Sequence, residues 1–148
     1  MLFRSPRAVV NSLKSVGFFR RSKDPRRELS WFVEKICHRM DIDVKAGMLI
    51  RTILPDGYML IRFEDLAQDP LLSVSKLYKF AGIEILDTIK KWLNHTTTSA
   101  NGDRSAYSTI RDSKQVVANW RRKMSCETVQ LVENVCGRVM RQMDYKIN

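Results

Sequence analysis

The sequence has 148 residues, of which 44% are hydrophobic, and a formal net charge of +10. This length predicts one domain or part of one, with enough apolar residues for a core, which excludes a disordered chain. The positive charge favours an anionic partner such as a nucleotide, an acidic glycan, a nucleic acid or a membrane surface. No stretch approaches ~18 consecutive apolar residues, and the first residues hold no apolar region of signal-peptide length, so we expect neither a membrane span nor a signal peptide.

The first predicted elements are the end of a strand, over residues 1–4, and a helix. Ser5 is a typical N-cap residue, and Pro6 suits the first helical position. Gly17 is a typical helix stop. Between them, apolar residues recur at helical spacing: Val9, Leu13 and Val16.

A polar segment and a long helix come next. Residues 20–28 predict a loop, because most are charged and Pro25 lies among them. Residues 28–53 predict an amphipathic helix, although Gly47 weakens its second half. The expected inner stripe of this helix is Leu29, Phe32, Ile36, Met40 and Val44.

A second strand is predicted after a turn at residues 55–57. Residues 58–63 read YMLIRF, are rich in strand-forming types and are apolar on both faces. Such a strand is typical of the buried centre of a parallel sheet.

The rest of the chain is predicted to be helical, apart from a long loop over residues 95–109. One helix begins at Asp69-Pro70 and ends at Gly82, and another covers residues 86–93. Two further helices are expected to be capped by Ser113 and Ser125. The residues expected to be buried here, together with Trp31, are Leu71, Val74, Leu77, Tyr78, Ala81, Ile89, Trp92, Leu93, Val117, Trp120, Val129, Val132, Cys136, Val139 and Met143.

The order strand, helix, strand predicts an α/β fold with a parallel sheet. Two strands do not form such a sheet alone, so further strands are expected from sequence outside this chain. Arg4 stands at the end of the first strand, where an arginine can form paired hydrogen bonds to a phosphate. Ser12 can present a hydroxyl near the same sheet edge, where open α/β sheets bind nucleotides. The alternative is that Arg4 is a surface cation and that Ser12 has no role.

Several segments, taken together and in order, resemble one family. They are RSPRAVVNS, YMLIRFEDLAQDP, KLYKFAGI, WLNHTT, YSTIRDS, ANWRRKM and VCGRVMRQMDY. These are similar to the 3′-phosphate-binding segment, the next conserved strand and the closing segments of the carbohydrate sulfotransferases. The resemblance is to the branch that sulfates the 6-hydroxyl of galactose, N-acetylglucosamine or N-acetylgalactosamine. It implies that residues 1–148 are the C-terminal part of a sulfotransferase domain.

The resemblance implies a P-loop-NTPase-like sulfotransferase fold, here incomplete and mostly helical. It implies transfer of a sulfuryl group from 3′-phosphoadenosine 5′-phosphosulfate (PAPS) to a galactose- or N-acetylglucosamine-containing glycan, in the Golgi lumen, with a membrane anchor in full-length members. Arg4 and Ser12 would hold the 3′-phosphate of the donor, Arg7 would support the site, and Arg111 would close over the nucleotide. Ser5 stands where the family usually has an aspartate, which keeps a helix cap and removes one charge.

In this family a phosphate-cradling loop binds the reacting 5′-phosphosulfate, and a cation there stabilises charge on the leaving phosphate. No Gly-rich GxxxxGK[ST]-like segment occurs in the 148 residues. We therefore expect this chain alone to be an inactive fragment or a degenerate relative, and its catalytic residues stay unassigned.

The three cysteines and two histidines lack the spacing of a zinc site, so no metal is expected. Cys37 and His38 are neighbours on a predicted helix and point about 100° apart, which disfavours a nucleophile–base pair. Cys37 and Cys136 would form a disulfide in a lumenal protein, with Cys126 free, or would be two buried thiols. Asn94-His95-Thr96 is a glycosylation sequon, which matters only in a secretory lumen.

Other charged residues each allow two interpretations. The basic residues within 20–27 could meet an anionic glycan or could be a solvated charge run. Glu64 and Asp65 could include a general base, but we favour pairing with an arginine or capping of the next turn. His95, at the start of the predicted long loop, could contact the acceptor, but we favour an exposed loop histidine without a functional role.

Three functions follow from the sequence. The first is a PAPS-dependent carbohydrate 6-O-sulfotransferase domain, and the second is a non-catalytic module that binds a nucleotide or a sulfated glycan. The third, a helical nucleic-acid binder, rests on net charge alone. Because the chain has neither an aromatic-rich RNA-binding strand nor a Cys/His zinc set, we expect no nucleic-acid partner.

Overall fold

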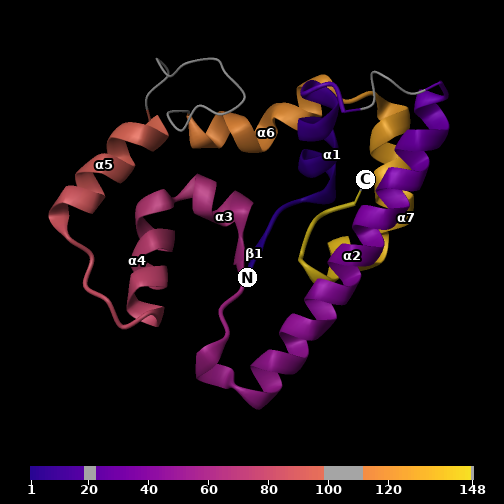
Figure 1. Cartoon of the computed structure of the whole chain (residues 1–148). Coiled ribbons are helices and arrows are strands. Elements are labelled where there is room, and N and C mark those ends of the chain that lie inside the picture. The colour runs from indigo at the N-terminus through magenta and orange to yellow at the C-terminus, as the bar shows by residue number, and fades with distance from the viewer. Residues whose placement is uncertain (19–22, 99–111, 148) are drawn as a thin grey trace. The chain divides into compact units, whose positions relative to one another are not determined.

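The computed structural model describes residues 1–18, 23–98 and 112–147 (Figure 1). The chain divides into two compact units. The strand unit comprises Met1–Phe3 and Met59–Asn119, and the helical unit comprises Arg4–Tyr58 and Trp120–Asn148. None of the described helices combines the length and apolar character needed to cross a membrane.

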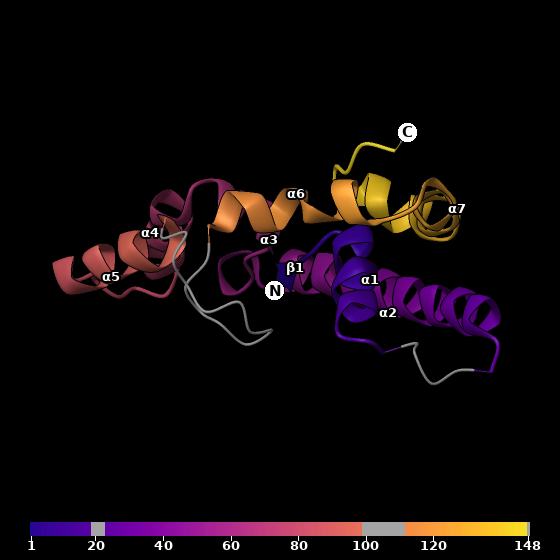
Figure 2. The same ribbon diagram turned by 90° about the horizontal axis from the view of Figure 1, so that it is seen from above.

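Three long elements dominate the helical unit: α1 (Pro6–Ser15), α2 (Pro25–Ile53) and α7 (Cys126–Gln142). The helix α2 lies along α7, and α1 packs against both, as the two ribbon views show (Figures 1 and 2). A short 3-10 helix, η1 (Pro55–Gly57), follows α2. The side chains at the centre are fully buried: Val10, Val33, Val44, Val132, Val139 and Met140. Burial of each such side chain contributes about 1.5–3 kcal/mol, so this core holds the three helices together.

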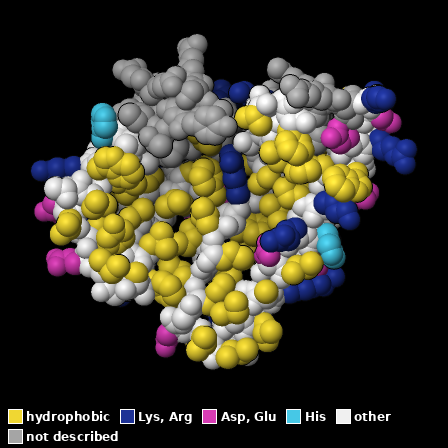
Figure 3. All heavy atoms as spheres, in the orientation of Figure 1, with side chains coloured by type: hydrophobic (Ala, Val, Ile, Leu, Met, Phe, Trp, Pro, Cys, Tyr) yellow, Lys and Arg dark blue, Asp and Glu magenta, His cyan; other side chains and the backbone are white. Residues whose placement is uncertain are grey.

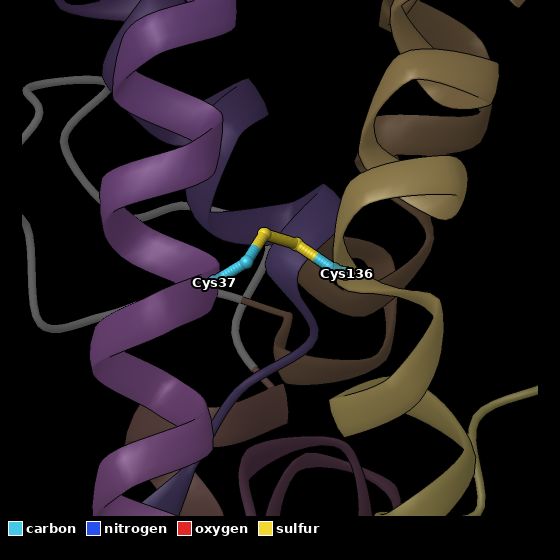
Figure 4. Close-up of a disulfide and its surroundings, with 2 residues drawn as sticks. All are labelled: Cys37 and Cys136. Carbon is cyan, nitrogen blue, oxygen red and sulfur yellow. A yellow bond between two sulfur atoms is a disulfide. The ribbon is translucent and has the colours of Figure 1, made fainter.

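A disulfide between Cys37 and Cys136 joins α2 to α7 (Figure 4). Their Cα atoms are 5.1 Å apart, and both residues are buried. Of the two alternatives that the sequence leaves open, the structure contains the disulfide, and Cys126 is free and exposed. Because the bond closes a loop of 99 residues, the chain-entropy relation gives about 4–5 kcal/mol of stabilisation.

The helix α1 confirms the first predicted helix. Pro6 is its first residue, and Gly17 follows its end with a φ of 78°. The N–H of Gly17 donates to the carbonyl of Lys14, and that of Phe18 donates to the carbonyl of Leu13, both at 3.1 Å. This pair of bonds is a Schellman motif, whose left-handed residue favours glycine.

The helix α2 begins three residues earlier than predicted. The Oδ1 atom of Asp24 accepts a hydrogen bond from the N–H of Arg27 at 3.1 Å, and Pro25 takes the first helical position. The predicted loop is therefore wrong over residues 25–28, because this proline starts the helix instead of interrupting it.

The inner stripe of α2 is also displaced by about one residue. Val44 is buried as expected, but the other buried residues are Val33, Cys37 and Gly47, whereas the remaining predicted members are only half-buried. One residue corresponds to about 100° around a helix, and α7 contacts the face that carries Cys37. Trp31 consequently lies outside the core, with 57% of its surface exposed, and the expectation that it is buried is wrong.

The helix α7 agrees with its prediction. The Oγ atom of Ser125 accepts from the N–H of Thr128 at 3.3 Å, which caps the helix as expected. Of its five expected core residues, Val129 is only half-buried. The other four are buried: Val132, Cys136, Val139 and Met143.

The strand unit contains a two-stranded parallel sheet of β1 (Leu2–Phe3) and β2 (Ile61–Arg62). Leu2 pairs with Ile61 and Phe3 with Arg62, which confirms the parallel arrangement. The second strand is shorter than predicted, because Phe63 already begins a helix. It is also half-buried rather than central, since β1 is the only strand paired with it among the described residues.

Four helices follow β2: α3 (Phe63–Gln68), α4 (Pro70–Phe80), α5 (Asp87–Thr98) and α6 (Ser113–Lys123). Asp69 caps α4 by accepting from the N–H of Leu72 at 3.0 Å, as predicted. The short helix α3 was not predicted. The last part of α6, from Trp120, belongs to the helical unit, where Trp120 is buried as expected.

The helix α5 extends five residues beyond its predicted end. Thr96, Thr97 and Thr98 each donate a side-chain hydrogen bond to a carbonyl one turn earlier, so their hydroxyls are satisfied within the helix. The predicted loop is therefore wrong over residues 95–98, and residues 99–109 lie outside the described part of the chain. Asn94 and His95 are exposed on α5.

Many apolar side chains of the strand unit and of the second half of α2 are exposed (Figure 3). Trp92 is 58% exposed, and α4 has no buried residue, so the expected burial along α4 and α5 is wrong. The helical spacing of these residues agrees with the prediction, but the contacts of α4 with α3 and α5 leave many of their apolar side chains exposed.

Candidate functional site

The first candidate residue, Arg4, directly precedes the start of α1. It follows β1 in the sequence and is half-buried. Ser5 is the N-cap of α1 and is almost fully buried, but its side chain makes no capping hydrogen bond. Ser5 therefore occupies the predicted N-cap position, but its side chain does not accept the hydrogen bond that usually makes a serine cap.

The N-terminus of α1 differs from those of α2, α4 and α7. In those three helices, side chains of Asp24, Asp69 and Ser125 accept a hydrogen bond from a backbone N–H of the first turn. The first turn of α1 has neither a side-chain cap nor an acidic residue. Since the first N–H groups of a helix attract negative charge, this end of α1 suits an anion.

Ser12 lies on α1 and is half-buried. Seven residues separate it from Ser5, which at about 100° per residue places both on nearly the same side of the helix. The carbonyl of Ser12 accepts from the Oγ atom of Ser15 at 2.7 Å. Ser12 and the N-cap Ser5 therefore lie on nearly the same side of α1, about two turns apart.

Arg7 occupies a different face of α1. Its guanidinium is buried, and Nη1 lies 2.6 Å from Oε1 of Glu133 on α7. The guanidinium carbon also lies 4.3 Å from the ring centroid of Trp120. Five residues separate Arg7 from Ser12, or about 140° around the helix, so Arg7 contacts α7 and holds α1 in place.

Glu133 and Trp120 complete a buried cluster around Arg7. Arg121 adds a second guanidinium, 4.6 Å from the same indole centroid. Glu133 was not predicted, although the sequence contains a signal: it stands beside Val132 and three residues before Cys136, near the inner stripe of a predicted helix. An acidic residue at such a position needs a buried cationic partner.

The fourth candidate, Arg111, lies outside the described residues. The next residue, Asp112, caps α6 by accepting from the N–H groups of Lys114 and Gln115 at 3.0 and 3.2 Å. The predicted cap, Ser113, is instead the first residue of α6, and its Oγ atom donates to the carbonyl of Ala67 at 2.7 Å.

The two acidic residues after β2 lie where structural roles are available to them. Glu64 and Asp65 lie in the first turn of α3, where negative charge is favourable. Asp65 also lies 3.6 Å from Nε of Arg62, which agrees with the favoured pairing to an arginine. Among the described residues, no group of three or more His, Cys, Asp and Glu side chains is arranged to hold a metal ion.

Comparisons with family models and with curated proteins agree on one family. Residues 1–144 match the sulfotransferase domain family. Human carbohydrate sulfotransferase 3 is 31% identical over 160 aligned positions, which cover 99% of this chain and 33% of that protein. Carbohydrate sulfotransferase 1 of Mus musculus is 31% identical, and that of Danio rerio 33% identical, over 76% and 75% of the chain.

The chain spans between 27% and 33% of the length of these curated relatives. No solved structure matches it. The family match nevertheless extends over all of the described elements, from β1 to α7. The chain therefore belongs to the sulfotransferase family and is related to the carbohydrate sulfotransferases.

Proposed function

We propose that this chain is the C-terminal part of a carbohydrate sulfotransferase domain that binds PAPS. The full-length protein would transfer the sulfuryl group to the 6-hydroxyl of a galactose or N-acetylhexosamine residue in a glycan, in the Golgi lumen. The observation that carries the reaction class is the sulfotransferase match over residues 1–144. The names of the relatives support a carbohydrate acceptor.

The proposed site for the 3′-phosphate of the donor comprises Arg4, the first turn of α1 and Ser12 further along the same helix. Arg4 would form charge-assisted hydrogen bonds to the phosphate, and Ser12 would donate from its hydroxyl. The uncapped, acid-free first turn of α1 supports this assignment, because its N–H groups favour an anion. Arg111 stays a proposed nucleotide contact.

Arg7 would act as a positioning residue at this site. Its guanidinium is engaged by Glu133 and Trp120, so it is occupied on the side of α1 away from Ser12. The buried pair would fix the rotation of α1 about its axis. It would thereby determine where the Ser12 hydroxyl points.

The proposed fold of the complete domain is P-loop-NTPase-like, with a parallel sheet to which β1 and β2 contribute. The parallel pairing of Leu2 with Ile61 supports this, since parallel strands need crossover connections and further strands. The exposed apolar side chains of α4 and α5 support an additional covering part.

The test of this function is transfer of labelled sulfate from PAPS by the full-length protein to glycans with free 6-hydroxyls. Sulfated product with galactose- or N-acetylhexosamine-containing acceptors is expected, and an Arg4→Ala variant should lose most of it. Nucleotide binding without transfer to any glycan would instead support a non-catalytic binding module.

A further inference from the structure

The sequon Asn94-His95-Thr96 has no part in the proposed reaction, and the structure gives it a definite place. It is the only Asn-X-Ser/Thr triplet in the 148 residues and lies in the last two turns of α5. Asn94 is exposed, and its neighbours on the same helix face, Lys91 and Thr98, are exposed polar residues as well. This face of α5 therefore suits solvent and leaves room for a bulky sugar on the Asn94 amide.

The threonine of the sequon is held on the other side of α5. Thr96 is only 5% exposed, and its Oγ1 atom donates to the carbonyls of Trp92 and Leu93 at 3.0 and 3.1 Å. Residues two apart on a helix point about 160° apart, so Asn94 and Thr96 do not face each other in α5. In an extended chain, residues two apart lie on the same side. An enzyme that reads both residues together therefore needs this segment before it becomes helical.

The disulfide between Cys37 and Cys136 independently indicates a compartment in which sequons are modified. Disulfides form and persist in secretory lumens and are rare in the cytosol. The sequon lies within the loop that this bond closes, so its segment shares the compartment of the two cysteines. A sequon and a disulfide that agree on the compartment support modification of Asn94 more strongly than the triplet does alone.

We propose that Asn94 carries an N-linked glycan, which is added before α5 folds and which keeps the Asn94 face of α5 at the surface of the complete protein. In the transfer, the Nδ2 atom of Asn94 forms a bond to the anomeric carbon of the first sugar of a lipid-linked oligosaccharide. The bond from that carbon to the diphosphate oxygen breaks, the lipid diphosphate leaves, and a base of the transferring enzyme takes one amide proton.

The glycan would distinguish two faces of α5. Trp92, two residues before Asn94, points about 160° away and is 58% exposed, so its face stays available to the covering part proposed above. The inference rests on the lumenal location in the proposed function, and it requires neither nucleotide binding nor sulfuryl transfer.

The first test translates the chain behind a cleavable signal sequence in the presence of endoplasmic-reticulum microsomes. One glycan should be added, seen as a single gel shift that peptide N-glycosidase reverses. Asn94→Gln and Thr96→Val should abolish the shift, and Thr96→Ser should retain it, because the hydroxyl is kept. No shift for the original chain, or the same shift for Asn94→Gln, would overturn the assignment of the site.

The order of events is tested by incubating the purified, folded chain with the transferring enzyme and a lipid-linked oligosaccharide. The original chain should stay unmodified, because α5 is already formed. Lys91→Pro interrupts α5 at an exposed position without changing the sequon, and should be modified about tenfold more or better. Lys91→Ala keeps the helix and is the matched control, which should stay unmodified. Equal modification of the original chain and of Lys91→Pro would refute addition before folding.

The full-length protein from secretory cells tests the glycan in the complete molecule. Peptide N-glycosidase should remove the glycan from Asn94 without denaturation, since this face of α5 lies at the surface. An unmodified Asn94, or a glycan released only after denaturation, would overturn the proposal. Sulfuryl transfer measured on the same preparation separates the two claims: a glycosylated Asn94 without transfer contradicts the proposed function alone, and transfer with an unmodified Asn94 contradicts this inference alone.

Discussion

The guanidinium of Arg7 and the carboxylate of Glu133, 126 residues apart in the sequence, lie 2.6 Å apart with side chains only 5% exposed. The pair connects α1 to α7 within the helical unit, beside Trp120. A buried charge is costly without its partner, so the position of α1 depends on both residues. This relationship links the stability of the unit to the proposed nucleotide site.

Removal of one member of this pair should be strongly destabilising. Glu133→Ala leaves the Arg7 guanidinium buried without a carboxylate and should lower the free energy of unfolding by about 3–5 kcal/mol. Chemical denaturation measures this value, with Gln130→Ala, an exposed position on the same helix, as the control. A loss below about 1 kcal/mol would show that the pair is not needed.

The double variant Arg7→Met/Glu133→Leu should recover most of that stability, because apolar replacement of both partners of a buried pair is often neutral. If the pair positions α1, nucleotide affinity should fall in Glu133→Ala and partly return in the double variant. An unchanged affinity in Glu133→Ala, measured under conditions where the variant is folded, would refute the positioning role.

The disulfide between Cys37 and Cys136 should be a main determinant of stability. Cys37→Ala/Cys136→Ala should lower the free energy of unfolding by about 4–5 kcal/mol, because the unfolded chain loses a long cross-link. The control is Cys126→Ser, which changes the free, exposed cysteine and should leave stability within about 0.5 kcal/mol. Equal effects of the two changes would mean that the disulfide does not form.

The close approach of Tyr58 to Gly47 predicts an unusual response to a helix-favouring change. An added Cβ at Gly47 would lie 2.6 Å from Cζ of Tyr58, and closer still to its hydroxyl. Gly47→Ala should therefore destabilise the unit by about 1–2 kcal/mol, although alanine favours helices by about 1 kcal/mol. In a Tyr58→Ala background the same change should become stabilising, and a destabilising effect there would contradict the steric explanation.

Asp41 should make stability depend on pH in the acid range. Lys45 donates to its carboxylate at 2.6 Å, and this hydrogen bond, with the nearby positive charge of Arg138, holds the pKa of Asp41 below its usual value. Because the pKa is lower in the folded state, the contribution is present above the unfolded value of about 3.9 and is lost as pH falls below it.

Denaturation at a series of pH values between about 5 and 2 measures this dependence. Asp41→Asn should flatten the fall in stability, and Lys45→Met should do so too, since it removes the main cause. If Asp41→Asn loses stability as steeply as the original chain below pH ~4, the ion pair does not contribute.

Local chemistry allowed much of this fold to be predicted. Ser5-Pro6 and Gly17 marked the ends of α1, and Asp69-Pro70 and Ser125 marked the starts of α4 and α7. Capping depends on residues within one turn, so the sequence contains the necessary information. The parallel pairing of β1 with β2 followed from the order of elements.

The errors concern features that depend on distant residues. The exposure of Trp31 and Trp92 depends on which helix faces are covered, and an apolar stripe does not reveal this. The helical end of α5 was missed because threonines resemble a loop in composition, although their hydroxyls bond within the helix. Glu133 was missed because its partner, Arg7, is distant in sequence.

For the candidate site, Arg4 and Ser12 stay predictions from the sequence, and the structure adds the uncapped first turn of α1 between them. The hydroxyl of Ser12 should contribute less than the charge of Arg4. Ser12→Ala should weaken binding of 3′-phosphoadenosine 5′-phosphate by about 3- to 10-fold, as expected for one neutral donor. Ser15→Ala, which removes an exposed hydroxyl one turn further, is the control and should have no effect.

The most direct test compares 3′-phosphoadenosine 5′-phosphate with adenosine 5′-monophosphate, which lacks the 3′-phosphate, by titration calorimetry on the original chain and on Arg4→Ala. We expect Arg4→Ala to weaken binding of the first ligand about 10- to 150-fold and to leave binding of the second nearly unchanged. Arg26→Ala, which changes an exposed arginine on α2, should alter neither. If the original chain binds both nucleotides equally, or if Arg4→Ala and Arg26→Ala have the same effect, the proposed phosphate site is wrong.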